Sequence, residues 1–160
     1  MARYAANNLL GGTQQNLSTS FKTVVSTNAA TGATTLRRGW WDEIDVGQDG
    51  LPNATDCQVV WSVDRMTAAG TGTGVTAAPL ETNDAAALLT YVANYTAEPT
   101  VTGATSLLPI ALNQRQNARW KVFDLNQALV IPATNLAGLV LRAKSTTFAA
   151  TTVGHVYCVE

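Results

Sequence analysis

Carboxylates come closest to a catalytic arrangement in this chain. Asp42, Glu43 and Asp45 form its only dense acidic cluster. Two carboxylates can share general-acid and general-base work when their side chains face each other. Successive residues of a strand point to opposite faces, however, so an extended segment would turn Asp42 away from Glu43. We therefore expect no catalytic dyad at this cluster.

His155 is the only histidine of the chain, which also has just two cysteines. To act as a base, it would need an orienting carboxylate and a nearby nucleophile. It lies in an alternating segment close to the carboxyl end, where a packed or half-exposed imidazole is the simpler interpretation. These residues predict a protein that is not an enzyme and has no catalytic residues, although a hydrolase built on a sandwich fold stays open as an alternative.

Two further segments have part of the pattern of a ligand site. An oxygen-rich loop is formed by Asp45, Asp49, Asn53 and Asp56. Its spacing does not match the 12-residue calcium loop, and no glutamate closes it. The glycine-rich run 70–74 lacks the Lys-Ser/Thr ending and the following helix of a phosphate-binding loop. We expect turns in the first segment, a mobile loop in the second, and neither a metal nor a cofactor.

The adjacent tryptophans Trp40 and Trp41 pose a geometric problem. Neighbours on a strand face opposite ways, so only one of them can enter a one-sided core. The other is expected to be covered by a loop, a ligand or a partner chain. Trp61 and Trp120 are interpreted as core residues, since most tryptophans of a sandwich fill the space between its sheets.

Short apolar-alternating runs separated by turn residues make up most of the chain. The clearest strand is 57–66, where Cys57, Val59, Trp61 and Val63 share one face. Further strands are expected at 17–25, 36–46, 107–113, 118–125, 129–132, 138–143 and 147–159. Pro109 makes 107–113 an edge strand, because proline cannot donate to a central ladder.

Three segments depart from this strand pattern. Residues 85–93 are rich in Ala and Leu and predict a short helix capped by Asn83 or Asp84. The Gly/Thr/Ala-rich segment 67–79 predicts a long loop. Residues 1–15 have no core pattern and are interpreted as an extended amino-terminal arm. The predicted fold is an all-β, antiparallel, jelly-roll-like sandwich over residues 16–160, with one short helix and long loops.

Composition excludes several classes of function. A formal net charge of −1 argues against a nucleic-acid binder, which normally presents a basic face. No apolar run approaches the roughly 18 residues that span a bilayer, and the amino terminus lacks the apolar core of a signal peptide. We expect no nucleic-acid or membrane partner and synthesis in the cytoplasm. Cys57 and Cys158 are expected to be free thiols, although a disulfide between them stays open.

A set of short phrases is similar to a known class of proteins. The phrases are Arg65–Thr73, Pro79–Leu80 with Asp84–Ala86, Asn94–Thr100, Leu112–Arg115 with Arg119–Trp120, and Ile131–Asn135 before Gly138–Leu139. Together they resemble small structural proteins of tailed bacteriophages, over most of residues 30–160. The resemblance implies a component of the virion, made in the host cytoplasm, that decorates and stabilises a capsid as a cement protein. It carries over no active-site residues.

Partners are expected to follow from this resemblance. They are the major capsid protein and further copies of the chain, most simply as a homotrimer at a local threefold position of the shell. Contact residues are expected at Arg3 and Tyr4 of the arm and at Trp40 and Trp41. The alternative function is a carbohydrate- or receptor-binding module of a phage tail or fibre, with an exposed tryptophan platform.

Overall fold

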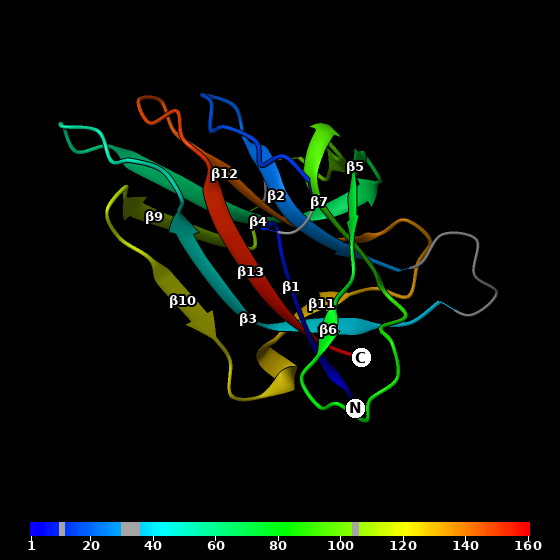
Figure 1. The fold of residues 1–160 in the computed structure, drawn as a ribbon. Coiled ribbons are helices and arrows are strands. Elements are labelled where there is room, and N and C mark those ends of the chain that lie inside the picture. The colour runs from blue at the N-terminus through cyan, green and yellow to red at the C-terminus, as the bar shows by residue number, and fades with distance from the viewer. Residues whose placement is uncertain (10–11, 30–35, 104–105) are drawn as a thin grey trace.

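Two antiparallel β-sheets packed face to face form the protein (Figure 1). The computed structural model describes residues 1–9, 12–29, 36–103 and 106–160. Within these ranges the one helical element is a 3-10 turn, η1 (Leu125–Gln127), and no helix is long and apolar enough to cross a bilayer. The predicted all-β antiparallel sandwich is confirmed.

The six-stranded sheet contains the first and the last strand of the chain. Its order is β10 (Ala118–Lys121), β3 (Gly39–Gln48), β13 (Thr152–Val159), β1 (Arg3–Asn7) and β6 (Ala78–Pro79), with β11 (Leu129–Ile131) also paired to β3. β13 therefore lies between β3 and β1, and every pairing is antiparallel.

The seven-stranded sheet forms the second layer. Its order is β5 (Thr71–Val75), β7 (Thr90–Ala97), β2 (Lys22–Asn28), β12 (Gly138–Lys144), β4 (Gln58–Ala68) and β8 (Thr100–Val101), with β9 (Leu108–Asn113) also paired to β4. β9 pairs with no other described strand, so the edge position predicted from Pro109 is confirmed.

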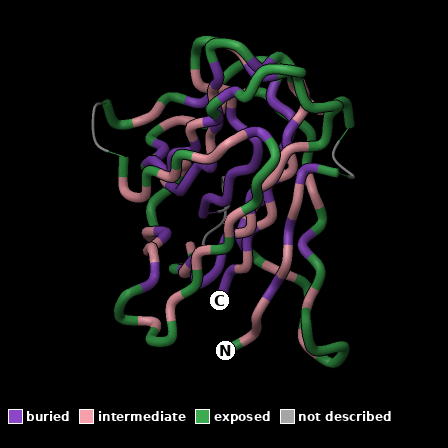
Figure 2. Tube along the Cα trace, turned by 90° about the vertical axis from the view of Figure 1, so that its left-hand side faces the viewer, coloured by how far each residue is buried: buried purple, intermediate pink, exposed green. Residues whose placement is uncertain are grey.

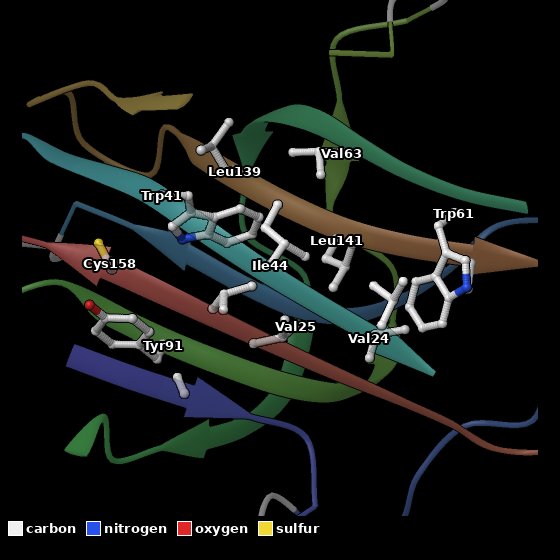
Figure 3. Close-up of a cluster of buried hydrophobic side chains, with 14 of the residues drawn as sticks. Val24, Val25, Trp41, Ile44, Trp61, Val63, Tyr91, Leu139, Leu141 and Cys158 are labelled. Carbon is white, nitrogen blue, oxygen red and sulfur yellow. The ribbon is translucent and has the colours of Figure 1, made fainter. Parts of the chain in front are cut away.

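The core fills the space between the sheets, and the exposed residues gather in the loops at the two ends (Figure 2). On β4, Val59, Trp61 and Val63 are buried together, as their alternation predicts. Figure 3 shows Trp61 at one end of this cluster and Tyr91 and Cys158 at the other, with Trp41 and Ile44 between them.

The predicted helix over 85–93 is wrong. Ala85 and Ala86 lie in an exposed loop, and β7 begins at Thr90. Tyr91 and Ala93 alternate into the core on the same face of β7, which an isolated Ala/Leu-rich segment does not reveal. Burial against the facing sheet outweighs helix propensity here, because propensity differences are only tenths of a kcal/mol per residue.

The segment 67–79 is also more regular than predicted, since it holds the end of β4 and both β5 and β6. β5 pairs with β7, where the register changes from Thr71 opposite Ala97 to Thr73 opposite Ala93. The extra residues lie on β7 and include Asn94, whose φ of 49° is left-handed. Pairing with a strand distant in the sequence orders this segment, and its composition alone did not predict that pairing.

The predicted arm over 1–15 is wrong for its first residues, which form β1. Tyr4 and Ala6 are buried in the core, and the Tyr4 hydroxyl donates to the carbonyl of Ala85 at 2.8 Å. Backbone hydrogen bonds also join Ala2 to Glu160 in both directions. The alternation of buried and half-buried residues in β1 is weak in the sequence, because the inward positions hold one tyrosine and small or polar residues instead of a run of large aliphatic ones.

Cys57 and Cys158 are both free and buried, as expected. Burial raises the pKa of the Cys158 thiol to about 12, with the Glu160 carboxylate adding to the shift. A thiol with so high a pKa is almost fully protonated at neutral pH and is a poor nucleophile. Cys158 therefore acts as a small apolar core residue.

Candidate functional site on the six-stranded sheet

Charged side chains gather on the face of the six-stranded sheet that points away from the core. In the β3–β10 register, Glu43 lies opposite Lys121 and Asp45 lies opposite Arg119. On the other side of β3, His155 of β13 lies opposite Asp45. Directly opposed residues of an antiparallel pair project to the same face, so the register itself brings these groups together.

Glu43 is at the centre of the group. We call Arg3, Asp42, Glu43, Asp45, Arg119 and Lys121 the charge cluster. The Glu43 side chain is 1% exposed and is ion-paired with three cations. Arg3 Nη2 lies 2.8 Å and Lys121 Nζ 3.3 Å from Glu43 Oε2, and Arg119 pairs with Oε1. A buried carboxylate needs such partners, because desolvating an unpaired charge costs several kcal/mol.

Asp42 also belongs to this outer group, contrary to the sequence prediction. β3 contains a bulge at this point: Glu43 pairs with Tyr157 and Trp41 with Cys158, which leaves Asp42 as the extra residue. A bulge breaks strict alternation, so two successive side chains can reach the same face. Arg3 then bridges both acids, with its Nε 2.9 Å from Asp42 Oδ2.

Cationic neighbours set the protonation state of Glu43. Burial alone would raise the pKa of the Glu43 carboxyl, but hydrogen bonds from Arg3, Lys121 and Arg119 outweigh burial and lower it. A general acid needs the opposite shift, towards neutral pH. Asp42 and Glu43 are therefore brought together as an ion-paired structural group, with Arg3 shared between them.

His155 stacks on Tyr157, with 4.4 Å between the ring centroids, and Arg3 lies 4.6 Å from the centre of the Tyr157 ring. Burial lowers the pKa of His155, opposed by the nearby carboxylates of Asp45 and Glu43. Its buried Nε2 has no hydrogen-bond partner among the residues that the structure describes. The imidazole is therefore held by stacking and is not oriented as a base by a carboxylate hydrogen bond.

The four predicted contact residues divide into two buried and two accessible ones. Trp41 is fully buried, and its Nε1 donates to Thr27 Oγ1 at 3.0 Å. Tyr4 is buried as well, so neither side chain can meet a partner directly. Arg3 is 30% exposed within the charge cluster. Trp40 is half-buried and lines an open hollow of about 580 Å³ together with Met1, Leu36, Arg37, Arg38 and Glu160.

A second polar group lies on the outer face of the seven-stranded sheet. Asp64 is buried and accepts from Arg142 Nε at 3.0 Å and from Ser62 Oγ at 2.8 Å. Arg142 also lies 4.8 Å from the centre of the Phe21 ring. These contacts satisfy every charge of the group, so we interpret it as a structural ion pair. Across the described ranges, no three His, Cys, Asp or Glu side chains lie close enough to hold a metal ion.

Arg119 and Lys121 are site residues that the sequence analysis missed. The sequence does contain a pattern that indicates them. On one strand two acids, Glu43 and Asp45, flank an apolar residue, and on another two cations, Arg119 and Lys121, do the same. Two such segments of opposite charge are expected to pair side by side. Finding them required knowing that β3 and β10 are neighbours.

The charge cluster is chemically balanced, with three cations facing three carboxylates. Arg119 is 61% and Lys121 41% exposed, so their charged ends are available to a polar surface. No family model matches the chain, and neither the curated proteins nor the solved structures include a significant match. The geometry is that of an ion-paired polar surface on the outer face of the sheet.

Acid should weaken the fold through Glu43. Its folded-state pKa lies below the ordinary value of 4.5, so its contribution to stability is complete above that pH and is lost as the pH falls through the folded-state pKa. The Glu43→Gln variant lacks this contribution. We expect the difference in unfolding free energy between wild type and variant to shrink between about pH 6 and about pH 3 in urea titrations.

Glu81→Gln, at an exposed turn residue, is the matched control and should keep the pH dependence of the wild type. An equal difference between wild type and Glu43→Gln at both pH values would show that the ion pairs of Glu43 add no stability.

Proposed function

We propose that the protein is a non-enzymatic structural component of a phage particle that decorates the capsid and stabilises the shell by binding the major capsid protein. The observation that carries this proposal is the charge cluster, a preorganised set of ion pairs on an outer sheet face. The resemblance of the sequence to small phage structural proteins supports it. The protein would be made in the host cytoplasm and then added to the virion.

The physical properties of this face suit docking. Charges already fixed by neighbours lose little side-chain entropy on binding, and complementary potentials select the correct partner. Arg119 and Lys121 supply exposed donors, whereas the acids beneath them are neutralised. Charged residues make up only 13% of the chain, so this face is a distinct polar feature on a surface that is otherwise rich in small, uncharged side chains.

Arg119→Glu is expected to reduce binding to the capsid. The test uses particles of the phage that encodes the protein, assembled without it, and measures bound copies per particle and the thermal stability of the shell. Wild type should bind and raise the stability of the shell. Arg119→Glu should lose at least about tenfold in affinity, because it replaces an exposed cation of the charge cluster with an anion.

Arg65→Glu is the control, because Arg65 is an exposed arginine of β4 in the other sheet. If wild type fails to bind the particles, the proposed function is wrong. If Arg65→Glu loses binding while Arg119→Glu keeps it, the protein is a decoration protein that docks through the other sheet.

Trp40 favours a second candidate function, a carbohydrate- or receptor-binding module. Its half-buried ring lines the hollow described above, beside the exposed Arg37 and Arg38. Because Trp41 is buried, any stacking platform for a sugar is reduced to Trp40 alone. A glycan array probed with wild type and Trp40→Ala tests this candidate: a glycan bound by wild type and lost in the variant would support it, and an array without binding would reject it.

A further inference from the structure

β5 is the last strand of the seven-stranded sheet and is open along one side. It pairs with β7, and among the described residues no strand pairs with its other edge. Thr71, Gly72, Thr73 and Gly74 are all exposed. A strand in this position presents a row of unpaired N–H and C=O groups, which another strand can use as a template.

The other edge strands carry features that discourage such pairing. β9 contains Pro109, and β10 carries Arg119 and Lys121. β6, β8 and β11 are no longer than three residues. Proline, charge and short length are the usual protections of sheet edges. β5 has none of them, and no charged residue occurs from Met66 to Leu80.

Of the two glycines of β5, Gly72 packs against β7, whereas Gly74 keeps its part of the strand accessible. A Cβ added at Gly74 would have nothing within 4 Å, so this position faces open space. Glycine inside a strand weakens it and often marks a place where another backbone comes close. The extra residues at the β5–β7 irregularity lie on β7, so β5 itself continues without an insertion from Thr71 to Val75.

We propose that β5 pairs antiparallel with β5 of a second copy of this chain across a twofold axis, so that the two seven-stranded sheets become continuous. An axis at Thr73 places this residue opposite its own copy, and threonine pairs are favourable across strands. An uncharged strand meets no like charge when it pairs with itself. Twofold contact of this kind closes at two copies. The pairing goes beyond the proposed function and does not depend on it.

Gly74→Lys tests the pairing with little risk to the monomer, because the new side chain enters open space. Light scattering coupled to size-exclusion chromatography should give a dimer mass for wild type at about 0.1 mM, and Gly74→Lys should weaken dimerisation at least about tenfold. Gly103→Lys is the matched control, since a Cβ there also meets nothing within 4 Å. This control should keep the dimer mass of the wild type.

Mixing Gly74→Lys with Gly74→Glu provides a readout that misfolding cannot imitate. Opposite charges would then meet across the axis, and the mixture should regain the dimer mass that each variant lacks alone. In the wild type, amide hydrogen exchange over Thr71–Val75 should slow as the protein concentration rises.

Three results would overturn the pairing. They are a monomeric wild type with exchange in β5 independent of concentration, an oligomer that Gly74→Lys leaves intact, and an equal loss of mass in Gly103→Lys. The trimer expected from the phage resemblance is distinguished from this dimer by its mass. The outcome of the capsid-binding test does not bear on the pairing.

Discussion

Deletion of residues 1–8 is expected to abolish the stable fold. β1 is paired on both sides, to β13 and to β6, and it places Tyr4 and Ala6 in the core. Asn8 Nδ2 also donates to the carbonyl of Thr152 at 2.7 Å. Loss of the buried apolar surface and of these hydrogen bonds should cost more than about 5 kcal/mol, which approaches the whole stability of a typical domain. Far-UV circular dichroism and urea unfolding of the truncated protein measure this effect.

Tyr4→Phe is the graded control for the deletion. It keeps the buried ring and removes only the hydroxyl that donates to Ala85, so we expect a loss of about 1 kcal/mol and an intact fold. Cooperative unfolding of the truncated protein near the wild-type midpoint would instead restore the interpretation of residues 1–15 as a separable arm.

Trp61→Ala should lower the free energy of unfolding by about 3–5 kcal/mol through the cavity that it leaves. Trp61 is fully buried beside Val59 and Val63, and the facing sheet closes the space above it. Denaturant titration measures the loss. A change below about 1 kcal/mol would contradict the core position of this residue.

Two substitutions separate the size of tryptophan from its hydrogen bond. Trp61 Nε1 is buried without a partner among the described residues, whereas Trp41 Nε1 donates to Thr27. Trp41→Phe should therefore cost about 1 kcal/mol more than Trp61→Phe, because it leaves a buried hydroxyl unsatisfied. Trp40→Ala, at a half-buried position, should cost less than Trp61→Ala.

The sequence predicts the fold best where the residue pattern of a single strand shows which of its faces is buried. β4 alternates Cys57, Val59, Trp61 and Val63 against more polar neighbours, and this pattern needs no knowledge of its partners. Pro109 marks an edge for an equally local reason. The same periodicity, together with frequent turn residues, is enough to indicate an antiparallel sandwich.

Prediction failed where a distant partner determines the structure. Residues 85–93 have the composition of a helix. The segment from Thr90 is nevertheless a strand, because β7 pairs with β2, with Thr90 opposite Asn28. Tyr4 and Ala6 become core residues because β13 lies beside β1. Their small or isolated side chains carry too little signal to predict that neighbour.

The prediction that Asp42 and Glu43 lie apart failed for a related reason. Strict alternation separates Asp42 from Glu43, but a single bulge reverses this result, and bulges depend on the opposing strand as well as on local sequence. The cations that complete the site come from β1 and β10, which are far from β3 in the chain. The acids alone could be found from the sequence, whereas their neutralisation could not.

The position of β13 between β1 and β3 has a consequence for folding kinetics. The six-stranded sheet cannot form its central pairs until residues 152–159 are available, because β1 has no other long partner among the described strands. Topologies dominated by such distant pairings fold slowly, on the millisecond-to-second scale. During synthesis the first strand must wait with its edges unpaired for the last one, and this interval is when the chain is most exposed to aggregation.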